Sequence, residues 1–165
     1  MGKPKKPRKK YRPRAVLKNP IGYVIESITP LQNHDFSLTT LKIKHSQAML
    51  ALIQGRATKS DMDTLISMCN VVEALLEEGF GTQYKYAHEH GKYAIITIAT
   101  RAVVHGRFTP TGPEISMLNK LMELHDAQME IITVRELEKA IALVESRLRR
   151  GKDTVKLPTV SNQLC

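Results

Sequence analysis

Apolar side chains recur at helical spacing along the chain from residue 44 onward. The first clear stripe lies within residues 44–53 and consists of Ala48, Met49, Leu52 and Ile53. Gly55 follows this stripe, as glycine often does just beyond the C-terminus of a helix. The pattern therefore predicts a helix that begins near Lys44 and ends before Gly55.

A broader apolar face follows residues 58–61, whose sequence Thr-Lys-Ser-Asp is a capping box that marks a helix start. Up to Gly79, the face consists of Met62, Leu65, Ile66, Cys69, Val72, Ala74, Leu75 and Leu76. A helix that is apolar over so wide an arc is covered by other elements on several sides. We therefore predict a central helix here.

The next segment, residues 83–105, also has an apolar helical face, and Thr82 is the expected N-cap. Gly91 lies inside this pattern and costs about 1 kcal/mol relative to Ala. Two helices separated at Gly91 are therefore an alternative to a single one. The β-branched residues at 95–98 leave a strand as a further alternative.

Two apolar seams follow a loop that Gly106 and Pro110 bracket, and a helix starts at residues 111–114. The first seam is Ile115, Leu118, Met122, His125, Met129 and Ile132, and the second is Met117, Leu121, Leu124, Gln128 and Ile131. A later seam does not continue the first, and consists of Val134, Leu137, Ile141, Val144 and Leu148. Because residues 133–136 form another capping box, we predict a sharp kink or a new helix at 132–134. A single long helix is the alternative, and Gly151 ends it.

The region before residue 44 gives mixed signals. Asn19 and Pro20 are typical of a helix start, so we predict a short helix over residues 20–28 that Pro30 ends. Residues 30–37 are polar and predict a loop. Residues 39–43 have β character, so a strand competes with a helix there.

These elements predict an all-α fold, a bundle of about five to six helices that spans residues 19–151. Residues 1–18 combine many basic residues with three prolines, and we expect them to form a disordered arm. Residues 152–165 lack a periodic pattern, and we expect them to form a flexible C-terminal tail.

Net charge divides the chain into a basic arm and a neutral remainder. Residues 1–18 hold nine of the 25 Lys and Arg residues, and no acidic residue precedes Glu26. The 16 basic residues that remain balance the 16 Asp and Glu residues. A tail of one sign on a neutral domain predicts a polyanionic partner, most often nucleic acid. An acidic protein, an anionic membrane surface and a role in solubility alone are the alternatives.

Each cation of the arm can neutralise a phosphate and release a counterion, and Tyr11 can stack on a base. A second basic cluster ends the last predicted helix, where cations also simply suit the helix dipole. The predicted nucleic-acid-binding residues are Lys3, Lys5, Lys6, Arg8, Lys9, Lys10, Tyr11, Arg12, Arg14, Lys18, Arg147, Arg149, Arg150 and Lys152.

His125 is the strongest single candidate for chemistry, because it lies on an apolar seam beside Asp126 and other acidic residues. An imidazole paired with a carboxylate can titrate near neutral pH and transfer protons. We favour instead a core histidine that is hydrogen-bonded to a side chain of a neighbouring helix. His88 and His90 do not share a helical face, so we interpret them as solvated positions. We predict no catalytic residue, cofactor or metal site.

The two cysteines predict one buried thiol and one exposed thiol rather than a disulfide, because Cys69 lies in an apolar run and Cys165 is the last residue. This use of cysteine fits a reducing compartment. We see no signal-peptide pattern and no apolar run long enough to span a membrane, and we expect a cytoplasmic protein. The wide Leu, Ile and Met surface is consistent with a homodimer.

Residues 55–58 (Gly-Arg-Ala-Thr), 61–65 (Asp-Met-Asp-Thr-Leu), 125–128 (His-Asp-Ala-Gln) and 133–137 (Thr-Val-Arg-Glu-Leu) carry a resemblance. They are similar to runs in small uncharacterised proteins of proteobacteria and of their phages and plasmids. The resemblance covers most of the predicted folded part. It implies a bacterial cytoplasm and is compatible with a role in a mobile element, but it brings no activity or site residues.

These features predict a non-enzymatic nucleic-acid-binding accessory protein whose arm contacts phosphates. One alternative is an adaptor or inhibitor that docks on a host protein complex. Another is a virion or scaffold subunit whose arm contacts packaged genome. An enzyme is the least favoured interpretation.

Overall fold

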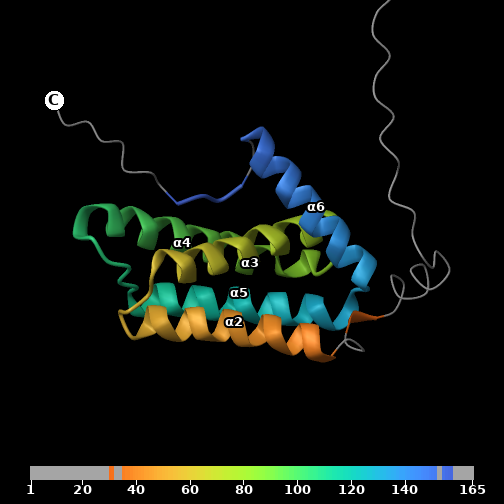
Figure 1. Cartoon of the computed structure of the whole chain (residues 1–165), viewed down its shortest axis with the longest axis horizontal. Helices are drawn as coiled ribbons and strands as arrows, with labels where there is room; N and C mark the ends of the chain where they lie inside the picture. The colour runs from red at the N-terminus through yellow and green to blue at the C-terminus, as the bar shows by residue number, and fades with distance from the viewer. Residues whose placement is uncertain (1–29, 32–34, 152–153, 158–165) are drawn as a thin grey trace, which may run out of the picture.

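The structure is a computed structural model that describes residues 30–31, 35–151 and 154–157 (Figure 1). These residues form five α-helices and one 3₁₀ turn, with no β-strand among them, so the predicted all-α fold is confirmed. The predicted arm at 1–18 and helix at 20–28 lie outside the described residues. The elements are α2 (Asp35–Ile53), α3 (Lys59–Glu77), η2 (Thr82–Tyr84), α4 (Lys85–His105), α5 (Gly112–Ile131) and α6 (Val134–Arg150).

Helix α3 lies at the centre of the bundle, as its wide apolar face predicts. It packs against α2, α4, α5 and α6, and ten of its residues are buried. In Figure 1, α3 and α4 lie above α5 and α2, and α6 crosses obliquely beside α3. One buried cluster fills the space between α2, α3, α4 and α5, and a second lies where α6 covers α3 and the end of α5.

Gly91 marks the closest approach of α4 to α5 and does not divide α4. A Cβ atom at Gly91 would lie 2.7 Å from both Cβ and Cδ2 of Leu121. Glycine is therefore required by the contact between the two helices, and α4 is a single helix through this point. The alternatives of two helices and of a strand at 95–98 were both wrong.

Three helices begin at the capping boxes that the sequence predicts. Thr58, Thr111 and Thr133 each accept a hydrogen bond from the backbone N–H three residues on, and the acidic side chain there accepts one in return. These motifs are local, so the sequence alone is enough to find them. Thr82, in contrast, starts η2, and the N-cap of α4 is Tyr84, which makes no side-chain cap. The prediction of Thr82 as the cap was wrong.

Helix α2 begins at Asp35, nine residues before the predicted start. The loop predicted for 30–37 was therefore wrong from residue 35, and so was the strand alternative at 39–43. Leu38 and Leu41 are half-buried against the second cluster, and they extend the apolar stripe of α2 toward its N-terminus. Packing of these two side chains outweighs the weak helix propensity of the β-branched residues around them.

The helix break predicted at 132–134 is confirmed. Ile132 and Thr133 both have extended backbone, with ψ of 160° and 165°. Leu31 donates its backbone N–H to the Ile132 carbonyl at 2.9 Å, so the chain before α2 is tied to this break. The apolar seam predicted for α6 is only partly buried, because Ile141 and Leu148 are exposed. The residues of α6 that are buried are Ala140 and Val144.

Residues 154–157, part of the predicted flexible tail, pack on the bundle. Val155 is buried, and its backbone N–H and carbonyl are both hydrogen-bonded to the side-chain amide of Asn70 on α3, at 2.9 and 3.2 Å. One buried amide therefore satisfies both backbone polar groups of a buried residue, which the core would otherwise leave unpaired. For this short stretch the expectation of a flexible tail was wrong.

Candidate functional site

Of the predicted nucleic-acid-binding residues, the structure describes Arg147, Arg149 and Arg150 at the end of α6. Arg147 forms a two-point ion pair with Glu77 of α3, in which Nη1 lies 3.1 Å from Oε1 and Nη2 lies 2.5 Å from Oε2. Arg149 lies 3.8 Å from Glu145, one turn earlier in the same helix. Both Arg149 and Arg150 are exposed.

This geometry divides these three arginines of α6 into two kinds. The Arg147 side chain is only 20% exposed and joins α6 to α3, so it stabilises the bundle. Arg149 and Arg150 lie on the last turn of α6, where a phosphate from solvent can reach them and where the helix dipole also favours cations. The ten predicted arm residues and Lys152 lie outside the described residues, so their role in nucleic-acid binding stays a prediction.

Several other cations of the bundle are bound to acidic residues of a neighbouring helix. Lys92 of α4 lies 2.8 Å from Glu73 of α3, and Lys139 of α6 pairs with Glu78 at the end of α3. Each pair neutralises charge where two elements meet. These pairs cancel part of the charge of the domain at the places where helices meet.

Arg101 and Glu114 form the most enclosed of these ion pairs. The Arg101 guanidinium donates two hydrogen bonds to the Glu114 carboxylate, at 2.7 and 3.1 Å, and one to the Thr109 carbonyl at 2.6 Å. The hydrogen bonds from Arg101 hold the pKa of Glu114 below its usual range. Because Glu114 also closes the capping box with Thr111, the pair fixes the loop between α4 and α5.

His125 is buried where α5 packs on α2, and its neighbour across this contact is His45. The two rings lie edge to face with their centroids 4.8 Å apart, and His125 is 2% exposed. Nδ1 of His125 also lies 3.8 Å from the carboxylate of Asp126. The burial agrees with the prediction of a core histidine, while the neighbour on the adjacent helix is a second imidazole.

His45 is uncharged at neutral pH. Burial, and after it the nearby His125, lower the pKa of His45 to about 4, while Asp126 acts in the opposite direction. Nδ1 of His45 has no hydrogen-bond partner within the described part of the chain. His45 is 6% exposed, and a general base must contact the substrate proton.

His88 lies in the core, so the interpretation of this residue as solvated was wrong. It is 3% exposed, and burial lowers its pKa. His90 is exposed, as predicted. The predicted burial of Cys69 is confirmed, and burial raises the pKa of its thiol to about 12, which makes the thiol unreactive.

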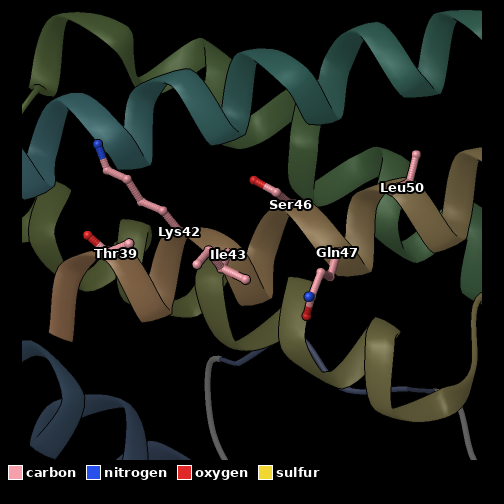
Figure 2. A pocket seen from close by; sticks show the side chains of 6 residues that line it. All are labelled: Thr39, Lys42, Ile43, Ser46, Gln47 and Leu50. Atoms are coloured by element: carbon pink, nitrogen blue, oxygen red, sulfur yellow. The ribbon is translucent and has the colours of Figure 1, made fainter. Parts of the chain in front are cut away.

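A shallow depression of about 340 Å³ lies on the outer face of α2 (Figure 2). Every residue that lines it belongs to α2, and Figure 2 shows their side chains spread along this helix. The lining residues are Thr39, Lys42, Ile43, Ser46, Gln47 and Leu50. This lining contains no carboxylate and no imidazole.

Within the described ranges, no group of three or more His, Cys, Asp or Glu side chains is placed to hold a metal ion. Among the helices that the structure describes, none has the length and apolar character needed to cross a membrane. No protein-family model, curated protein or solved structure matches the chain. The resemblance to proteins of phages and plasmids therefore stays a prediction.

The sequence did not single out His45, although a signal for it exists. His45 lies four residues after Leu41 and three before Ala48, and so falls on the apolar stripe of α2. With the helix start placed at Lys44, Leu41 was outside the predicted helix, and His45 lay in its first turn, ahead of the first apolar residue of the stripe. The pairing of His45 with His125 also depends on the α2–α5 contact, which periodicity within one helix cannot reveal.

Proposed function

We propose that this protein is a non-enzymatic nucleic-acid-binding accessory protein in which residues 1–18 supply most of the affinity. The observation that carries the proposal is the charge of this segment, which has nine Lys and Arg residues and no acidic residue before Glu26. Such a density of cations matches a phosphate backbone and displaces its condensed counterions.

The arrangement of charge in the bundle supports this assignment. Lys92, Arg101, Lys139 and Arg147 each pair with an acidic residue of another helix or of its cap. A phosphate would have to compete with a carboxylate for these cations. The arm, which has no acidic residue of its own, carries no such competitor in its sequence.

Replacing five of the six arm lysines by glutamine tests the proposal. The variant replaces Lys3, Lys5, Lys6, Lys9 and Lys10, and the matched control replaces Arg149 and Arg150. Gel-shift titrations with double-stranded DNA, single-stranded DNA and RNA of arbitrary sequence are expected to show at least a hundredfold loss for the arm variant on the preferred polymer. The control should lose less than about tenfold, since two exposed contacts are removed.

An arm variant that binds all three polymers as tightly as the wild-type protein would overturn the proposal. A wild-type protein that binds none of them at low salt would overturn it as well. The helical content of the variant, measured by circular dichroism, provides the check on folding.

A further inference from the structure

Helix α4 presents a stripe of large apolar and aromatic side chains on the face that points away from the bundle. Tyr86, Tyr93, Ile96 and Val104 are 52%, 61%, 47% and 77% exposed. The opposite face of α4 is buried against α3 and α5. The exposed residues Glu89 and Thr100 lie between members of this stripe. Single exposed apolar side chains are common, but several hundred Å² of apolar surface on one face marks an interaction surface.

The two ends of this stripe, Tyr86 and Val104, lie symmetrically about the middle of the helix, whereas the position that corresponds to Ile96 is the buried Ala94. Tyr86 and Val104 lie equally far from residue 95 on its two sides, and so do Tyr93 and Thr97. A two-fold axis at residue 95 would bring Tyr86 of one copy against Val104 of the other. The same axis would bring Ile96 close to its own copy. Such a self-complementary surface is the requirement for a dimer with two-fold symmetry.

We propose that the outer face of α4 is the interface of a symmetric homodimer in which α4 packs antiparallel against α4 of a second copy. The exposed parts of the stripe amount to roughly 500 Å² per copy, which gives about 1,000 Å² in a dimer, the lower bound for a specific interface. Tyrosine is also enriched at the centres of such interfaces.

Electrostatics favour a second copy over a charged partner on this face. Residues 93–100, at the centre of the stripe, contain no charged side chain. The chain outside the arm is neutral, because its 16 basic and 16 acidic residues balance. The charge that would oppose self-association therefore belongs to residues 1–18 and not to the proposed interface.

Sedimentation equilibrium of the full chain, after nuclease treatment and at about 1 M salt, tests the proposal without a contribution from nucleic acid. The wild-type protein is expected to show a concentration-dependent monomer–dimer equilibrium. Ile96→Lys should weaken the dimer at least tenfold, because it buries a charge next to its own copy. The matched control is Ile43→Lys on α2, where an isoleucine is 49% exposed against 47% at Ile96.

A cysteine at position 96 provides a second measurement. In a Cys165→Ser background, Ile96→Cys is expected to form a disulfide-linked dimer on mild oxidation, since the axis brings position 96 close to its copy. Ile43→Cys should not. A wild-type monomer at every concentration, or a dimer that Ile96→Lys leaves intact, would overturn the proposal. Neither outcome bears on nucleic-acid binding by the arm, so the two proposals can fail separately.

Discussion

The contact between Gly91 and Leu121 sets the distance between α4 and α5. An added Cβ at Gly91 would lie 2.7 Å from two atoms of Leu121, one of which is its Cβ and cannot rotate away. Gly91→Ala gains about 1 kcal/mol of helix propensity, but forcing a methyl group into a packed contact typically costs about 1–3 kcal/mol. We expect a net loss of unfolding free energy, measured by urea denaturation.

Gly112→Ala is the matched control for this substitution. Gly112 lies at the start of α5, and an added Cβ there would meet nothing within 4 Å. This control should leave the free energy of unfolding unchanged or raise it slightly. If Gly91→Ala is as stable as the wild-type protein, α4 and α5 do not pack as closely as described.

At the residue scale, the sequence predicts what is local and misses what depends on a neighbour. The capping boxes at Thr58, Thr111 and Thr133 involve residues three apart, and all three are found in the structure. Gly91, in contrast, was interpreted through helix propensity, although its role comes from Leu121 on another helix. The burial of His88 likewise depends on the packing of α4 and not on the residues beside it in the sequence.

At the scale of elements, the α2–α5 contact is expected to weaken in acid. The pKa of His45 is about 4 in the folded protein and 6.5 as an ordinary value, so the unfolded chain binds a proton that the folded one excludes. The titratable side chains that act on His45 are those of His125 and Asp126. The contribution of His45 to the free energy of unfolding should therefore be constant above about pH 7 and fall by about 1–3 kcal/mol between pH 6.5 and 4.

His45→Gln isolates the contribution of His45 to this pH dependence. Part of the slope should remain, because burial also lowers the pKa of His88. Urea denaturation from pH 4 to pH 8 should give a shallower slope for His45→Gln than for the wild-type protein. His105→Gln, at the exposed end of α4, should retain the full slope. Equal slopes for His45→Gln and the wild-type protein would contradict a buried neutral imidazole at this contact.

The helices themselves were largely predictable, while their limits and orientations were less so. Caps and glycines place the ends of α3 and α6 within a residue or two of the prediction. The start of α2 was missed because the β-branched residues at 39–43 obscure a stripe that only packing makes helical. The buried residues of α6 are Ala140 and Val144, whereas Ile141 of the predicted seam is exposed. The reason is that α6 covers only part of α3.

At the scale of the whole molecule, the net positive charge and the exposed apolar surface of α4 lie in different parts of the chain. The bundle pairs cations such as Arg101 and Arg147 with acidic residues of its own, and residues 1–18 hold the net positive charge. In the proposed account, the arm supplies affinity for phosphate. The outer face of α4 brings two arms together, which raises the effective concentration of one arm once the other is bound.

The salt dependence of binding is the most direct test of the central proposal, that residues 1–18 bind nucleic acid through phosphates. The measurement is the slope of log affinity against log salt for the wild-type protein and for the variant with five arm lysines replaced by glutamine. With six to nine phosphate contacts, the expected wild-type slope on duplex DNA is about −5 to −8, and the variant should be shallower by about 4. A slope that the arm substitutions leave unchanged would contradict the account.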